Sequence, residues 1–170
     1  RFDQKKAESI NGDHIRMLDA ADFAARLVPY LAAEGLFENP PTAAQQATLD
    51  AAAPLVHERM QLLGEAPGLL GFLFRDVTGY DEDALKGLPA NAGEVLVASV
   101  AALELVPEDA FTTAAVQEAL ANALIEELGL KPRVAYGPLR VAVSGRRISP
   151  PLFESMELLG KTVTIARLGA

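Results

Sequence analysis

Residues 137–153 read GPLRVAVSGRRISPPLF, and the rest of the chain is organised around this stretch. It holds three arginines within eight positions (Arg140, Arg146 and Arg147), among glycine and proline residues that are typical of turns. Ser149 and Pro150 form the pattern of a helix N-cap followed by a proline in the first turn. The helix predicted to follow ends at Gly160 and buries four apolar side chains, Leu152, Phe153, Met156 and Leu159.

A helix N-terminus beside unpaired arginines suits an anion, because free backbone N–H groups and guanidinium groups then point to one place. The same residues also fit a solvated, arginine-rich linker between two helices. The residues of this stretch alone leave both interpretations open, with an anion or a nucleic acid as the ligand in the first.

The composition favours packed helices. Half of the 170 residues are hydrophobic, Ala and Leu are abundant, and aromatic residues make up 6%. The chain has no cysteine, and therefore neither a disulfide framework nor thiolate chemistry. No apolar run reaches the ~18 residues of a membrane span, and no signal segment opens the sequence. We therefore expect a soluble, cytoplasmic protein with no membrane partner.

Charge is unevenly distributed along the chain. The net charge is −8, but residues 131–170 hold seven basic and two acidic side chains, +5, which leaves −13 on the other 130 residues. A basic end is the electrostatic footprint of a polyanion partner. An acidic body disfavours indiscriminate nucleic-acid binding, so DNA is not expected as a partner.

The first predicted helix begins near Phe2, where residues recur at helical spacing. Asn11 and Gly12 are expected to end it. Asp22 is the predicted cap of a second helix, which is predicted to carry Phe23, Leu27, Tyr30 and Leu31 on its apolar face and to stop at Gly35.

Thr42 and Gln45 form a capping-box pattern at the start of the next helix. Pro54 is expected to begin a further helix, which carries Leu55, Arg59, Leu62 and Leu63. A boundary between two domains is predicted near residues 71–75, where glycine and proline change the composition.

The second half contains a short acidic helix over 81–88 and an apolar helix over 94–106 that is predicted to be buried. Thr112 or Thr113 is expected to cap a helix whose stripe of Leu120, Leu124 and Leu128 ends before Gly129. Residues 141–143 have the propensity of a strand, but the glycine and proline residues around them leave little room for one.

Signatures of catalysis are missing. The sequence has no Walker loop, no dinucleotide-binding glycine pattern and no metal-ligand spacing, so no catalytic residue, cofactor or metal is expected in this chain. His14 and His57 are interpreted as structural residues, although either is a plausible acid–base group in principle. The acidic run 81–83 is better explained by the dipole of a helix N-terminus than by a metal.

Two stretches resemble bacterial glutamyl-tRNA synthetases. Residues 2–16 are similar to the segment that follows the catalytic core in that family, and residues 137–154 with 158–161 resemble its C-terminal signature. The resemblance implies a class I synthetase that joins glutamate to tRNA(Glu) with ATP and Mg²⁺. The family's ATP-binding motifs are not present in this sequence, and the chain opens without Met, so we expect a piece of a longer enzyme that is inactive alone.

The resemblance also implies an all-α fold, a monomeric helical cage of two anticodon-binding subdomains in which residues 141–143 are helical. Residues 1–23 would be the end of the stem-contact region, 24–73 the first subdomain and 74–170 the second. Arg59 stands where the family places an arginine that reads the third anticodon base. The family's pocket for the anticodon bases falls on Arg140, Ser149, Pro150, Leu152 and Phe153, and contacts to the tRNA backbone are expected from Lys131, Arg133, Arg146 and Arg147.

A second hypothesis belongs to another functional class. A helical protein-interaction module whose basic end docks an acidic partner would show the same composition and charge distribution. If the chain binds RNA but no protein partner, the first hypothesis is supported, and binding of a protein partner but no RNA supports the second.

Overall fold

The computed structural model describes residues 4–170, and their side chains from Lys6 onward. Helices and turns make up this part of the chain, which contains no strand, and the all-α prediction is confirmed. The chain divides into two compact units, Arg1–Arg75 and Asp76–Ala170. No helix among the described residues is both long and apolar enough to cross a membrane.

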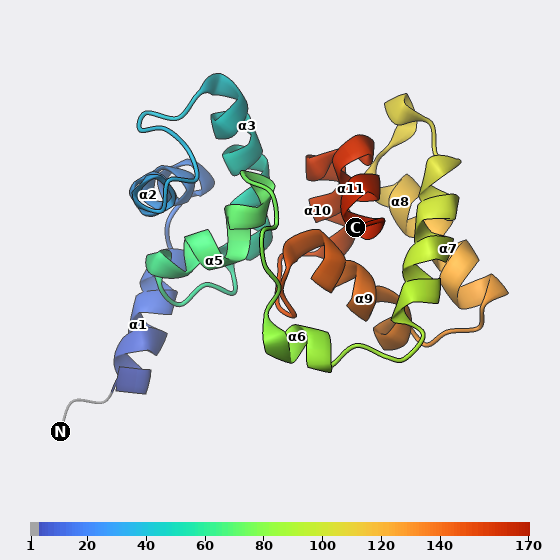
Figure 1. Ribbon diagram of the computed structural model, residues 1–170. Helices are drawn as coiled ribbons and strands as arrows, with labels where there is room; N and C mark the ends of the chain where they lie inside the picture. Colours follow the sequence, from blue (N-terminus) through green and yellow to red (C-terminus); the bar gives the residue numbers. More distant parts are fainter. Residues whose placement is uncertain (1–3) are drawn as a thin grey trace. The chain divides into compact units, whose positions relative to one another are not determined.

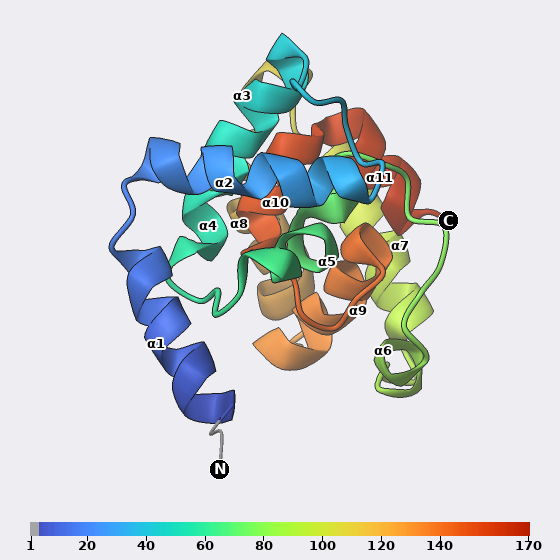
Figure 2. The ribbon, with the colours of Figure 1, turned by 90° about the vertical axis from the view of Figure 1, so that its left-hand side faces the viewer.

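Among its described residues, the first unit contains five α-helices and two short 3₁₀ turns. Figure 1 shows this part of the chain in blue to green. The helix α2 packs against α3 and α5 (Figure 2). Its side chains Phe23, Leu27 and Leu31 are fully buried. The elements of this unit are α1 (Gln4–Arg16), α2 (Ala20–Ala33), α3 (Ala43–Ala52), α4 (Pro54–His57), η1 (Leu63–Glu65), α5 (Ala66–Leu70) and η2 (Gly71–Leu73).

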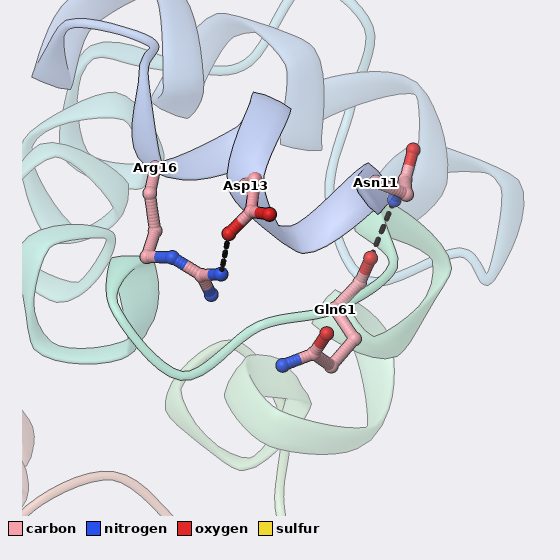
Figure 3. Close-up of polar contacts among 4 residues, drawn as sticks. All are labelled: Asn11, Asp13, Arg16 and Gln61. Carbon is pink, nitrogen blue, oxygen red and sulfur yellow. Dashed lines mark hydrogen bonds and ion pairs between the residues drawn. The ribbon is translucent and has the colours of Figure 1, made fainter. Parts of the chain in front are cut away.

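The expected helix break at Asn11 and Gly12 is wrong, because α1 continues through both residues. Asn11 Nδ2 donates a hydrogen bond to the backbone carbonyl of Gln61, as Figure 3 shows. Gly12 is buried against the side chain of Gln61, where a β-carbon would lie 2.5 Å from Oε1. These tertiary contacts override the local propensity of an Asn-Gly pair. Phe2 lies outside the described residues.

The end of α2 and the start of α3 are as predicted, but the N-cap of α2 is a different residue. Thr42 and Gln45 form the predicted capping box at the start of α3. The cap of α2 is Asp19, whose carboxylate accepts from the backbone N–H of Asp22, so the assignment of the cap to Asp22 is wrong by three residues. Gly35 stops α2 in the left-handed region, with φ +64°. Of the predicted apolar face of α2, Tyr30 is 42% exposed.

Pro54 occupies the first turn of α4, as predicted, but this helix ends at His57. Arg59 therefore lies in the turn after α4, and Leu62 has an extended backbone. The side chains of Val56 and Met60 are fully buried on either side of the turn. The apolar pattern thus extends over two elements, which the sequence pattern alone merged into one.

The second unit packs α7 against α8, α9 and α11, and α10 against α8 and α11 (Figure 1). Its core includes Leu103, Leu120, Leu124, Leu139 and Met156, all fully buried. The elements are α6 (Glu82–Lys86), α7 (Ala92–Glu104), η3 (Glu108–Ala110), α8 (Thr113–Leu120), the π-helical η4 (Ala121–Glu127), α9 (Pro132–Ser144), α10 (Leu152–Leu159) and α11 (Lys161–Leu168).

Two predictions in this unit are wrong in detail. The helix α7 is buried on one face only, and Val97, at 71% exposed, lies on its outer face. Thr112 caps α8, as expected, but α8 passes into the π-helical η4 and Leu128 is 51% exposed. A π-helix has more residues per turn than an α-helix, so the leucine stripe loses its phase after Leu124.

Candidate nucleic-acid interface

The helix α9 carries the residues of interest on one face. It begins with Pro132 in its first turn and contains Gly137 and Pro138, so the predicted turn at these two residues is wrong. Residues 141–143 are helical, as the family resemblance implies and against their strand propensity. Arg133, Tyr136 and Arg140 recur at the spacing that places side chains on the same side of an α-helix.

This face borders a pocket of about 480 Å³ in the second unit. The pocket lies between α9, α6 and the segment that follows α6, and α6 and α9 are neighbours in Figure 1. Three of the predicted site arginines meet there, and no carboxylate lines it. The lining residues are Ala84, Gly87, Leu88, Pro89, Pro132, Arg133, Val134, Tyr136, Gly137, Arg140, Val141 and Arg147.

Arg140 connects the pocket to the start of α10. Its Nη1 donates to Ser149 Oγ at 2.8 Å and to the carbonyl of Pro150 at 3.0 Å. Ser149 is 5% exposed, and its hydroxyl donates to the same carbonyl at 3.0 Å. Two expectations are thereby corrected, because Arg140 has partners and Ser149 is not an N-cap. The helix α10 begins at Leu152 without a side-chain cap, because its N-cap residue is Pro151, which has no polar side chain. The Ser149 hydroxyl is instead engaged with Arg140 and Pro150.

A glycine turn fixes the segment that follows α9. Gly145 ends the helix with φ +74°, and its carbonyl accepts from the backbone N–H of Asp81 at 2.9 Å. The Ser144 hydroxyl donates to the Arg140 carbonyl at 2.8 Å and accepts from the backbone N–H of Arg146. Both Arg146 and Arg147 are exposed beyond this turn, but of the two only Arg147 lines the pocket.

No carboxylate is among the residues that line the pocket, and two of its three arginines are exposed. Within residues 4–170, neither Arg133 nor Arg147 forms an ion pair. Lys131, the residue before α9, is exposed and is not part of the pocket lining. The arrangement attracts anions and repels Mg²⁺, whose ligands in proteins are oxygen atoms and chiefly carboxylates. The described residues contain no group of three His, Cys, Asp or Glu side chains placed to hold a metal ion.

Tyr136 is a pocket residue that was not among the predicted site residues. Its ring meets that of Phe153 edge to face, with centroids 5.2 Å apart. Burial raises the pKa of the Tyr136 hydroxyl above its ordinary value, so the group remains a protonated hydrogen-bond donor at neutral pH. Its position could have indicated this role, because Tyr136 lies three residues after Arg133 and four before Arg140, a spacing that places all three side chains on one face of a helix.

The remaining predicted site residues differ in accessibility. Phe153 is half-buried, as is Leu159, whereas Leu152 is 5% exposed and contributes to the core with Met156. The predicted burial of this helix face is therefore confirmed for Leu152 and Met156 only. Pro150 is buried and presents its carbonyl to Arg140.

Arg59 belongs to the other unit, Arg1–Arg75, and is exposed. His57 nearby has a structural role, as predicted. Its ring stacks on Phe23 with centroids 4.2 Å apart, and its Nε2 lies 2.7 Å from the carbonyl oxygen of Ile15. His14 is exposed on α1.

Solved structures with a similar fold are glutamate–tRNA synthetases. The enzyme of Elizabethkingia anophelis matches 99% of this chain with a TM-score of 0.76 and 23% identity, over 31% of its own length. The glutamate–tRNA ligase of Elizabethkingia meningosepticum matches 99% with a TM-score of 0.78 and 22% identity, over 32% of its length. At these identities the similarity establishes the fold.

Curated relatives share more of the sequence. The glutamate–tRNA ligase of Leifsonia xyli subsp. xyli is 62% identical over 170 residues, and that of an Arthrobacter species is 56% identical over 172 residues. These alignments cover 99% and 100% of this chain but 35% and 34% of the relatives, so the chain spans about a third of their length. Residues 22–170 match the family described as anticodon binding domain. Since this match covers well over half of the sequence, the chain belongs to the anticodon binding domain family.

Proposed function

We propose that this chain is the C-terminal, anticodon-binding part of a bacterial glutamate–tRNA ligase and that it recognises the anticodon of tRNA(Glu). The observation that carries the proposal is the pocket beside α9, which is lined by three arginines, Arg133, Arg140 and Arg147. A cationic surface attracts the phosphates of RNA. The net charge of −8 on the whole chain disfavours non-specific binding of nucleic acid to the rest of its surface. The relatives' name and the family match support tRNA as the partner.

The Arg140–Ser149–Pro150 network is the proposed base-reading element. Single-stranded RNA is recognised through splayed bases that stack on side chains and donate or accept hydrogen bonds at their exposed edges. Phe153 offers a half-buried ring for stacking, while the buried Pro150 and Leu152 shape the site from beneath. Lys131, Arg133, Arg146 and Arg147 are the proposed contacts to the RNA backbone.

Arg59 is proposed to read the third anticodon base. It is exposed in a short turn between the fully buried Val56 and Met60, so its guanidinium projects from a well-anchored backbone. Residues 1–23 are proposed to end the stem-contact region, and 24–73 and 74–170 to form the two subdomains.

The aminoacylation chemistry is assigned to the part of the ligase outside this chain. ATP and Mg²⁺ would bind there, and this chain alone is expected neither to activate glutamate nor to bind ATP. The whole ligase is proposed to be a monomeric cytoplasmic enzyme that joins glutamate to tRNA(Glu).

The test is direct binding of RNA to the 170-residue chain. A fluorescently labelled anticodon stem-loop of tRNA(Glu) is titrated against the same stem with a permuted loop, and against duplex DNA of equal charge. We expect the native loop to bind about tenfold or more tightly than either control, since each correct base contact discriminates by ~1–3 kcal/mol. Equal binding of all three would indicate docking by charge alone and favour the protein-interaction hypothesis.

A further inference from the structure

The turn that carries Arg59 is tied to the helix α1 on both sides. Just before the turn, the His57 ring reaches back to α1, where its Nε2 lies 2.7 Å from the carbonyl oxygen of Ile15. At the end of the turn, the Gln61 carbonyl accepts a hydrogen bond from Asn11 Nδ2 (Figure 3). Arg59 lies midway between these two anchors, and its side chain is exposed.

We propose that Asn11 and His57 are positioning residues that fix the direction of the Arg59 guanidinium group. The proposal rests on the function proposed above, in which Arg59 reads the third anticodon base. It adds that α1, which belongs to the proposed stem-contact region, sets the accuracy of a reader in the adjoining subdomain.

The Asn11 anchor depends on a close approach between α1 and Gln61. Gly12, the next residue of α1, is buried, and a β-carbon there would lie 2.5 Å from Gln61 Oε1. The backbone N–H of Gln61 donates to Glu65 Oε2 at 3.3 Å, so both backbone polar groups of Gln61 have partners. Asn11 itself is exposed and is a poor helix former, so its contact with the turn accounts for it better than its contribution to α1.

The His57 anchor is held by a stacked ring. The imidazole lies on Phe23 of α2, with ring centroids 4.2 Å apart and an angle of 18° between the planes. Because a carbonyl oxygen only accepts, Nε2 carries the proton and donates to Ile15. The Ile15 carbonyl is among the last four of α1, which lack the partner that a helix interior supplies. His57 therefore helps to satisfy the end of α1 and fixes the entry to the turn.

The backbone between the two anchors has little freedom. Met60 is fully buried, and the backbone N–H groups of Arg59 and Met60 both donate to the Val56 carbonyl at 3.1 Å. A guanidinium group on a held backbone loses less entropy on binding and is more selective for geometry than one on a mobile loop. Loosening either anchor should therefore reduce the discrimination between two bases more than it reduces overall binding of tRNA.

The first experiment measures tRNA selection by the full-length ligase. Asn11→Ala removes the donor and raises helix propensity, so a weaker α1 cannot explain its effect. His57→Phe keeps an aromatic ring against Phe23 but removes the N–H donor. We expect each variant to narrow the ratio of kcat/KM between tRNA(Glu) and tRNA(Gln) about threefold, less than the roughly tenfold effect of Arg59→Gln.

The matched control is His14→Gln, which replaces another exposed side chain of α1 and should leave the ratio unchanged. A residue with a merely structural role would lower kcat/KM for both tRNAs equally and would not change the ratio. A ratio that is the same in Asn11→Ala, His57→Phe and the unaltered ligase therefore overturns the proposal.

Combination with Arg59→Gln shows whether the anchors act through Arg59. If they do, Asn11→Ala and His57→Phe narrow the ratio in the unaltered ligase but leave it nearly unchanged once Arg59 is replaced, because interacting sites are not additive. Equal effects in both backgrounds would show that the two residues act independently of Arg59. That result contradicts the positioning role and leaves Arg59 as the proposed reader.

Hydrogen exchange tests the anchors without tRNA and so separates this proposal from the function on which it rests. Exchange in the full-length ligase, followed by mass spectrometry, compares a peptide that covers residues 58–61 with one from α3. Asn11→Ala and His57→Phe should each speed exchange in the turn at least about threefold and leave α3 unchanged. Unchanged exchange in the turn refutes the anchors, whatever Arg59 reads. Faster exchange in the turn, together with an unaltered ratio in Arg59→Gln, instead refutes Arg59 as the reader, and its positioning with it.

Discussion

Gly145 lies so close to Gly79 that a β-carbon at position 145 would stand 2.7 Å from the Gly79 carbonyl oxygen. Its φ of +74° is in the left-handed region, which side chains rarely adopt. The segment 77–81 thus packs directly on the turn that presents Arg146 and Arg147. The position requires glycine for two independent reasons, backbone conformation and lack of space.

Replacing Gly145 by Ala is expected to destabilise the second unit by about 2–5 kcal/mol, the sum of the costs of a left-handed residue and of an overpacked contact. Unfolding in urea, followed by far-UV circular dichroism because the chain has no tryptophan, measures the change. Gly129→Ala is the matched control, because Gly129 has φ +63° but nothing within 4 Å of its β-carbon position. It should cost only about 1–2 kcal/mol. Equal costs for both variants would show that the contact with Gly79 is irrelevant.

Local signals predicted several helix boundaries of this fold. The Thr42–Gln45 capping box, Pro54 in a first turn and Gly160 at a helix end are each fixed by short-range chemistry. The errors arose where tertiary contacts decide. The helix α1 continues through Asn11 and Gly12 because Gln61, fifty residues away, supplies the partner.

Glu157 forms a polar link between α10 and the start of α8. Its carboxylate accepts from the hydroxyl and the backbone N–H of Thr113, and these bonds hold the pKa of Glu157 below its ordinary value. A lowered carboxyl pKa stabilises the fold above the ordinary pKa, and this contribution is lost as pH falls through the lowered value. The side chain is exposed, so the effect is small.

Glu157→Gln is therefore expected to lower the melting temperature by about 1–2 °C at pH 7 and to have no effect near pH 2. Thermal melts of both proteins between pH 2 and 7 measure the difference in melting temperature, which should disappear below about pH 4. Glu154→Gln, one turn earlier on α10, serves as the control. A difference that stays constant with pH would exclude the ionised carboxylate as its source.

The candidate site could be predicted in part. Arg140, Arg146 and Arg147 were identified because three guanidinium groups near turns are conspicuous in sequence. Of these, Arg140 and Arg147 line the pocket, together with Arg133, which only the family resemblance implied. The role of Ser149 as a partner of Arg140 was not predicted, because the same Ser-Pro pattern is typical of an N-cap. Tyr136 was missed because pocket membership depends on α6 and its following segment, which no pattern in α9 reveals.

Binding of the anticodon stem-loop should depend on salt. If Lys131, Arg133, Arg146 and Arg147 each neutralise a phosphate, log K is expected to fall with log[salt] with a slope of about −3, at ~0.7 per contact for single strands. Arg147→Gln should reduce the magnitude of this slope by about 0.7, whereas Arg26→Gln should leave it unchanged. Titrations at four salt concentrations measure it, and a slope near zero would remove the electrostatic docking role.

The exposed Arg59 provides the most specific test of recognition. Its guanidinium presents several donors in a rigid fork, whereas glutamine offers one amide and no charge. The third anticodon base is cytosine in tRNA(Glu) and guanine in tRNA(Gln). If Arg59 reads that base, cytosine should be favoured over guanine by ~1–3 kcal/mol, on the scale of base-edge contacts.

Arg59→Gln in the full-length ligase is therefore expected to narrow the ratio of kcat/KM between tRNA(Glu) and tRNA(Gln) by about tenfold, mainly by admitting tRNA(Gln). Charging assays with both purified tRNAs measure this ratio. Arg26→Gln, another exposed arginine of the same unit, is the matched control and should leave the ratio unchanged. If Arg59 only covers the surface of its turn, both tRNAs lose little and equally, and an unchanged ratio rules out its assignment as the reader of the third base.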